Sequence, residues 1–207
     1  MGLTVGMVGL TGFAVHKTVQ SGTGGEVAVA FPSTEDGETI PPQTLPPIQH
    51  IAVWQGNERE VYFSEALAAS GTFDVTSPAQ TSAFVRGKVP TTDLGQLTER
   101  EQTEAFAVLC NAAEADMVFA ARDLGMKTKK NTFSFSRGQQ SYTTDLMGFS
   151  CSQNSIVWRE QMALIVEIGD KTPSDAERNQ IAGEMWAERV IEASRSDTPD
   201  TPQAPND

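Results

Sequence analysis

The side chains that could act as nucleophiles lie in one short stretch of the 207-residue chain, Gly148-Phe149-Ser150-Cys151-Ser152. A catalytic serine on a sharp strand-to-helix turn has glycine two residues after it, and the catalytic histidine comes later in the chain than the serine. This chain has Ser152 at the position of that glycine. Both histidines, His16 and His50, precede Ser150 instead. A Cys151–His50 pair is compatible with the chain order. We therefore predict no catalytic residue, with a small hydrolase that uses Cys151 or Ser150 as the alternative.

Metal and cofactor sites would find few ligands in this sequence. It has two cysteines and two histidines, and no two of them stand at a ligand spacing. An acidic group at Asp93, Glu99, Glu101 and Glu104 is typical of a solvated helix start, where the helix dipole favours carboxylates. The glycines within 22–25 follow no strand and open no helix, so they do not indicate a phosphate-binding loop. We predict no metal site and no cofactor.

The two cysteines have a different significance. Cys110 falls on the predicted buried stripe of a helix, and Cys151 lies beside the start of a long predicted strand. Packing of that helix on the sheet could bring the two sulfurs within bridging range. In an exported protein they would form a disulfide, whereas in the cytosol both would be small buried apolar residues.

Five cations cluster locally, although the chain has 15 lysines and arginines against 27 aspartates and glutamates and a net charge of −12. They are Arg122, Lys127, Lys129, Lys130 and Arg137, at a predicted hairpin. Such a group either protects a sheet edge against pairing or docks an acidic partner or an anionic envelope polymer. We predict partner binding at these five residues. The acidic balance argues against nucleic acid as a partner, because phosphate binding needs a basic face.

Hydrophobic periodicity predicts an α+β fold in which helices pack on a mixed sheet. A strand over 48–54, a helix over 58–70 and a strand from Phe73 give a β-α-β beginning. A capping box over 98–101 starts another helix. Strand-like segments between 116 and 168 then predict an antiparallel meander. A final helix begins with Thr172 as its N-cap.

Composition divides the chain into four parts. Residues 1–20 carry no charge before Lys17 and are either a signal or anchor segment, which would allow membrane association, or a flexible terminus. Residues 21–47 are rich in glycine and proline and predict an extended linker. Residues 48–195 contain the α+β domain. Residues 196–207, with three prolines among polar residues, predict a disordered tail.

Several fold-shaping segments resemble the periplasmic domain family of the curli-secretion-channel lipoprotein, the penicillin-binding-protein activator lipoproteins and the TolB amino-terminal domain. The resemblance runs from about Pro47 to Ser194, and none of its segments is a catalytic motif. The segments are Ile51-Ala52-Val53-Trp54, Ser64-Glu65-Ala66-Leu67, Ser70-Gly71-Thr72-Phe73-Asp74-Val75, Ala115-Asp116-Met117-Val118-Phe119-Ala120, Ile156-Val157-Trp158-Arg159 and Trp186-Ala187.

This resemblance implies an exported, non-enzymatic protein of the cell envelope, located in the periplasm or at the outer membrane. It implies a lipoprotein-like scaffold that binds envelope protein partners in secretion or synthase activation. The first cysteine of the sequence is Cys110, so the lipid-bearing cysteine that such lipoproteins carry near the amino terminus is missing here. A structural ring subunit of a secretion assembly, formed as a homo-oligomer, is the alternative function.

Overall fold

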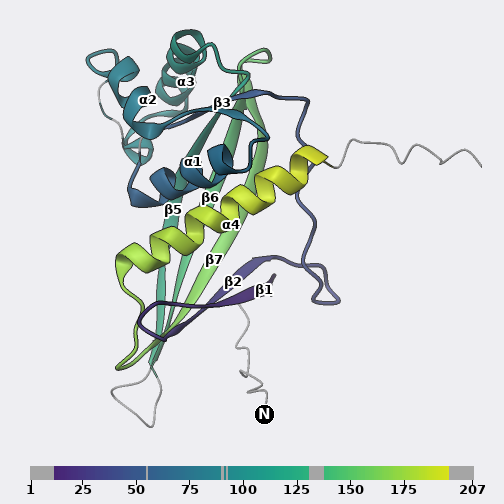
Figure 1. Cartoon of the computed structure of the whole chain (residues 1–207), viewed down its shortest axis with the longest axis vertical. Coiled ribbons are helices and arrows are strands. Elements are labelled where there is room, and N and C mark those ends of the chain that lie inside the picture. The colour runs from purple at the N-terminus through teal and green to yellow at the C-terminus, as the bar shows by residue number, and fades with distance from the viewer. Residues whose placement is uncertain (1–11, 55, 90, 92, 131–137, 196–207) are drawn as a thin grey trace, which may run out of the picture.

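One seven-stranded sheet forms the centre of the computed structural model, which describes residues 12–54, 56–89, 91, 93–130 and 138–195. The strands lie in the order β1-β2-β7-β6-β5-β3-β4, and Figure 1 shows their arrangement. Their bounds are β1 (Phe13–Gln20), β2 (Glu26–Pro32), β3 (His50–Val53), β4 (Asp74–Thr76), β5 (Met117–Lys130), β6 (Gly138–Ser150) and β7 (Ser155–Ile168). β3 runs parallel to both β4 and β5, and the other pairs are antiparallel.

Four helices pack on this sheet, so the prediction of an α+β fold with a mixed sheet is confirmed. They are α1 (Glu58–Ala69), α2 (Pro78–Val85), α3 (Glu99–Ala113) and α4 (Asp175–Arg195), with a short 3-10 helix η1 (Leu94–Gln96) before α3. The capping box predicted for α3 is present, with Thr98 and Glu101 bonded reciprocally. The predicted N-cap of α4 is wrong, because Ser174 and Glu177 cap that helix. Thr172 closes a turn with Gly169 instead.

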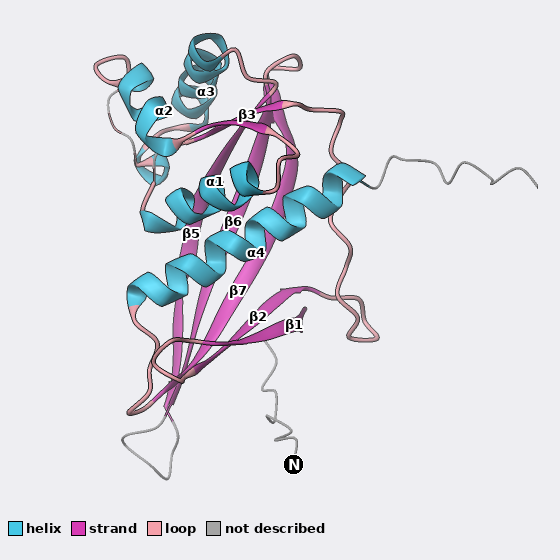
Figure 2. Ribbon diagram, in the orientation of Figure 1, coloured by secondary structure: helices cyan, strands magenta, loops and turns pink. Residues whose placement is uncertain are grey.

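Side-chain alternation along the central strands builds two separate cores. On β3, Ile51 and Val53 face the first core with α1 and α4, while Ala52 and Trp54, the residue after the strand, face the second core with α2 and α3. The first core extends over the whole sheet as far as β2. The second core ends on β5 at Ala120 and includes no residue of β7. Figure 2 shows β5, β6 and β7 continuing well past the level of α2 and α3.

The predicted linker needs correction, because residues 26–32 of the segment 21–47 form β2. Val27, Val29 and Phe31 are fully buried in the first core, and β2 pairs with β7. Apolar residues alternate over the seven residues of β2 and make this segment a strand despite the glycines before it. Those glycines belong to the turn that joins β1 to β2. Part of the predicted anchor segment is β1, so the packed unit includes residues well before 48. Residues 1–11 and the predicted tail over 196–207 lie outside the described residues.

Residues 33–47, called the strap below, are also held against the domain. The indole nitrogen of Trp158 donates to the Gln43 carbonyl at 2.7 Å. The Leu45 amide donates to the Ala193 carbonyl at 3.1 Å, and the Leu45 side chain is buried in the first core. The strap therefore connects β2 to β3 along the carboxyl end of α4 and the first half of β7 (Figure 1).

Candidate functional site

A polar sheet surface lies beyond the second core, on the side of the sheet opposite α1 and α4. Met147 of β6 belongs to the second core, so the side chains that alternate with it point to the same side. We call this surface the open sheet face. Its polar members include Arg122 and Lys127 on β5, Ser141, Thr143 and Asp145 on β6, and Arg159, Gln161 and Glu167 on β7, which the strand registers place on one side.

Two arginines flank a buried carboxylate in the middle of the open sheet face. Arg122 Nη2 donates to Asp145 Oδ2 at 2.9 Å, and Arg159 Nη1 lies 3.9 Å from the same oxygen. The Asp145 side chain is only 2% exposed, whereas the side chains of Arg122 and Arg159 are 36% and 53% exposed. The carboxylate is therefore inside the sheet surface, and both guanidinium groups reach solvent.

The structure brings only part of the predicted basic group to this face. Arg122 and Lys127 lie on it, and the backbone of Lys129, opposite Gln139, holds a position of the same alternation. Lys130 is the next position along β5, on the other side of the strand, and the side chains of both lysines lie outside the described part. Arg137 lies outside the described residues as well.

Sequence reasoning missed Arg159 and Asp145. Arg159 stands in the segment 156–168 on the side opposite its apolar residues, which is the signal that could have placed it on a solvent-facing surface. Asp145 gave no such signal, because its burial depends on a pairing between β5 and β6 that the sequence does not specify.

Cys110 and Cys151 form a disulfide that joins α3 to the turn between β6 and β7. Their Cα atoms are 5.5 Å apart, and 41 residues separate them in the chain. Both are partly buried and pack against the second core. The bridge therefore closes the end of the sheet at which β5 starts and β6 finishes.

The residues of the hydrolase alternative are all engaged in other interactions. Cys151 has no free thiol, because its sulfur belongs to the disulfide. Ser150 is buried, and its hydroxyl accepts from the Gln153 amide at 3.3 Å. The imidazole of His50 contacts the Thr76 hydroxyl at 3.2 Å. The thiol version of the hydrolase is therefore wrong for the oxidised chain.

The beginning of β3 is fixed by a carboxylate at the start of the neighbouring parallel strand β5. Asp116 accepts from the backbone amides of His50 at 2.9 Å and Gln49 at 2.8 Å. These two bonds hold the pKa of Asp116 below its usual range, because they favour the ionised form. The charged carboxylate of Asp116 therefore helps to fix the position of β3 relative to β5.

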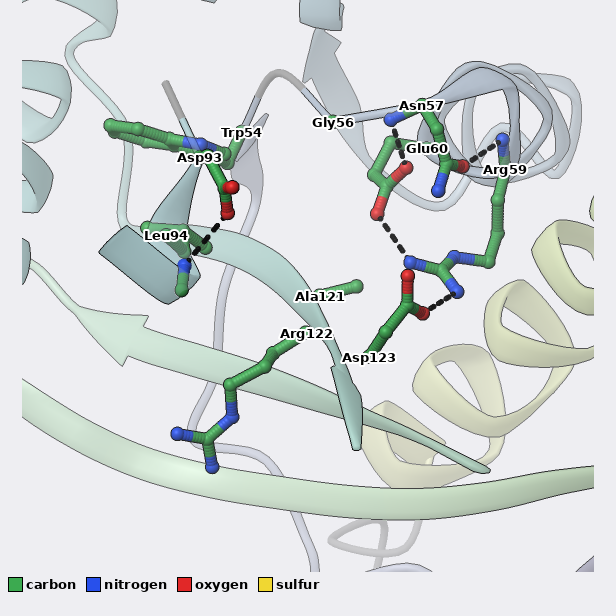
Figure 3. A pocket seen from close by; sticks show the side chains of 11 residues that line it. Trp54, Gly56, Asn57, Arg59, Glu60, Asp93, Leu94, Ala121, Arg122 and Asp123 are labelled. Carbon is green, nitrogen blue, oxygen red and sulfur yellow. Dashed lines mark hydrogen bonds and ion pairs between the residues drawn. The ribbon is translucent and has the colours of Figure 1, made fainter. Parts of the chain in front are cut away.

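A cavity of about 480 Å³ lies between the carboxyl end of β3 and the first turn of α1 (Figure 3). Buried Arg59 donates to Glu60 at 3.1 Å and to Asp123 at 2.7 Å, and its guanidinium lies 4.6 Å from the centre of the Trp186 ring. Glu60 also accepts from the Asn57 amide at 2.8 Å, which completes a capping box. Arg59, Glu60 and Asp123 thus pair with one another, whereas Arg122, which also lines the cavity, pairs with Asp145. The Nε atoms of Arg59 and Arg122 are buried and have no hydrogen-bond partner among the described residues.

Among the residues that the structure describes, no three histidine, cysteine, aspartate or glutamate side chains gather as a metal-binding group. Within the same residues, none of the helices has the length and apolar character needed to cross a membrane.

No family model matches the chain, and no curated protein sequence matches it. Several solved structures are similar at low identity. The PelC dodecamer from Paraburkholderia phytofirmans is 13% identical, with 81% of this chain and 97% of that chain covered and a TM-score of 0.40. Lipoprotein GNA1162 from Neisseria meningitidis is 10% identical over 69% and 98%, with a TM-score of 0.39. The LpoB C-terminal domain from Escherichia coli is 14% identical over 62% and 87%, with a TM-score of 0.35. Likeness at this level says nothing about function.

Proposed function

We propose that this chain is a non-enzymatic accessory protein of the cell envelope that binds or scaffolds partner proteins. The observation that carries the proposal is the disulfide between Cys110 and Cys151. Structural disulfides form and persist in oxidising compartments such as the periplasm and are rare in the cytosol. A bridge between a core helix and the central sheet is a structural bridge of this kind.

The open sheet face supports binding as the function. It presents exposed cations, Lys127 and Arg159, on a chain of net charge −12. Cations concentrated on one face of an acidic protein attract negatively charged groups to that face by local electrostatics. The partner-binding surface in this proposal comprises the residues predicted from the sequence, Arg122, Lys127, Lys129, Lys130 and Arg137.

Localisation and thiol state test the compartment together. Cells that naturally produce the chain are fractionated after their free thiols are blocked with an alkylating reagent, and the intact mass is measured without reduction. We expect the chain in the periplasmic or outer-membrane fraction with neither cysteine alkylated. A cytosolic chain with two alkylated cysteines would overturn the proposal.

Partner binding is tested with a charge-reversed surface. We expect the triple variant Lys127→Glu, Lys129→Glu and Lys130→Glu to keep its fold and to lose the envelope proteins that cross-link to the parent chain. A matched control, Arg86→Glu, Lys88→Glu and Arg100→Glu, changes the net charge equally at exposed positions outside the open sheet face. Equal cross-linking of both triple variants would remove this surface from the proposal.

A structural ring subunit is the second candidate function, and one observation favours it. Among the strands that the structure describes, β1 is an edge strand and pairs only with β2. An edge strand offers unpaired backbone groups to a second chain. Light scattering at micromolar concentration distinguishes the two functions, because a ring subunit gives a closed oligomer and an adaptor gives a monomer.

A further inference from the structure

We propose that Arg122, Asp145 and Arg159 form a recognition site for a carboxylate of the partner, and that the partner presents it on an acidic, extended segment of protein. This inference rests on the proposed function and names the chemistry of the partner that binds the open sheet face.

The charges of this cluster do not balance. Two guanidinium groups share one carboxylate, so the cluster has a net charge of about +1 at neutral pH. Arg122 makes the short contact at 2.9 Å, while Arg159 stays at 3.9 Å with half of its side chain exposed. The donors of Arg159 are thus largely available, and a planar guanidinium binds a second carboxylate through two parallel hydrogen bonds.

Asp145 has the role of a positioning residue. It belongs to the central strand β6, between Arg122 on β5 and Gln161 on β7 in the strand registers. A buried carboxylate needs positive partners, because an isolated buried charge is strongly unfavourable. Its presence therefore draws both arginine heads toward one point of an otherwise flat surface, from two different strands.

The next cation along the face sets the spacing of the ligand. Arg122 is opposite Asp145, and Lys127 is opposite Ser141, four positions away on β6. At about 3.3 Å per residue, the levels of these two residues are about 13 Å apart along the strands. An extended peptide places side chains of positions i and i+4 on one side at the same distance. The hydroxyl group of Thr143 lies between the levels of the two cations, that of Ser141 lies level with Lys127, and both can hydrogen-bond to the peptide backbone.

The net charge of the whole molecule favours a short protein segment over an extended polyanion. A bilayer or a long anionic polymer would extend past the open sheet face and meet the remaining surface of a chain with net charge −12. Repulsion between charges closer than the Debye length, about 8 Å at physiological salt, would oppose that contact. A segment with two carboxylates about 13 Å apart covers only the stretch from Arg159 to Lys127, and the acid of the same face, Glu167, lies beyond it opposite Gln139.

The test measures binding of a defined peptide to the full, oxidised chain by fluorescence anisotropy. The probe is a labelled twelve-residue peptide of serine, threonine and glycine with glutamate at its fourth and eighth positions. A second peptide with glutamine at both positions is the neutral control. We expect the acidic peptide to bind, the neutral peptide not to bind, and Arg159→Gln to weaken binding roughly fivefold, the equivalent of losing one exposed ion pair. Lys127→Gln should weaken it similarly.

Arg100→Gln is the matched control, because Arg100 is an exposed cation on α3, away from the open sheet face. Equal binding by the Arg159→Gln and Arg100→Gln variants, or equal binding of both peptides, would overturn the inference. Vesicles containing phosphatidylglycerol serve as a second probe, and binding to them that depends on Arg159 would identify a membrane surface instead. If the peptide fails while the chain is found oxidised in the envelope, the inference fails and the proposed function stands. A reduced cytosolic chain would overturn the proposed function, whatever the peptide result.

Discussion

Arg189 of α4 connects four parts of the molecule through one buried guanidinium. Its Nη2 donates to Glu160 of β7 at 2.6 Å and to the Ile40 carbonyl of the strap at 2.8 Å, and its Nη1 donates to Glu192 at 3.1 Å. The guanidinium also lies 4.5 Å from the centre of the Phe31 ring on β2. Because the side chain is almost completely buried, these partners replace its solvent.

Arg189→Met should lower the free energy of unfolding by about 3–5 kcal/mol, because it leaves Glu160 buried without its cation. Burial raises the pKa of Glu160 already in the parent chain, and loss of the arginine raises it further. A group with a raised pKa stabilises the fold below its unfolded pKa and loses that contribution as the pH rises through the folded pKa. The deficit should therefore be smaller at about pH 5 than at about pH 8.

Urea unfolding of both chains at the two pH values measures this deficit. Arg100→Met, which removes an exposed cation, is the control and should change stability by less than about 1 kcal/mol at either pH. A deficit of equal size at both pH values would show that the charge of Glu160 is not the cause.

The sequence indicates one partner of the Glu160–Arg189 ion pair but not the other. Glu160 is visible as the one charged residue on the apolar side of the segment 156–168, which identifies a buried acid in need of a partner. The partner itself lies 29 residues later, on a helix whose angle across the sheet decides which side chain meets Glu160. Periodicity predicts faces of elements, and it does not predict contacts between them.

At the scale of elements, α4 and α1 approach so closely that one glycine is required between them. A Cβ atom at Gly183 of α4 would lie 2.6 Å from the Arg59 carbonyl oxygen and 2.7 Å from the Phe63 amide nitrogen of α1. Both are backbone atoms, which cannot move away as the end of a flexible side chain can. The crossing of the two helices therefore depends on the missing side chain.

Gly183→Ala should destabilise the fold by about 1–3 kcal/mol through overpacking, although alanine is the better helix former. Thermal unfolding followed by circular dichroism measures the change. Gly169→Ala is the control, since a Cβ atom there has no neighbour within 4 Å and the backbone is not left-handed. A higher midpoint in Gly183→Ala than in the parent chain would contradict the close approach.

Sequence signals within a few residues predict individual helices and strands well. Strand pairings between distant parts of the chain are not predicted by such signals. The capping box of α3 lies within four residues, so the sequence is sufficient to place it. The sequence predicts linker where β2 lies, because the partner strand β7 is far away in the chain, as in the pair Val27 and Val166. The glycines before β2 and the prolines after it dominate the composition of 21–47, and the apolar alternation within it is only seven residues long.

At the scale of the whole molecule, the sheet carries two cores of unequal extent, and the disulfide belongs to the smaller one. The second core consists of side chains from α2, η1 and α3 that pack on the end of β3, the start of β5 and the end of β6. Fewer buried side chains hold α3 than hold α4, so a covalent connection between α3 and the sheet has more effect here than it would in the first core. The same bridge fixes the carboxyl end of β6, the strand that carries Asp145 of the open sheet face.

Removing the bridge should therefore cost about 2–4 kcal/mol of unfolding free energy, as expected for a closed loop of this length. The double variant Cys110→Ala and Cys151→Ala, and the parent chain in reductant, should show the same loss in urea unfolding. Because α4 and the first core are intact, α3 should lose amide protection against hydrogen exchange before α4 does. If the loss of protection were equal in both helices, the two cores would unfold as one unit. The bridge would then stabilise the whole sheet, and the second core would have no separate dependence on oxidation.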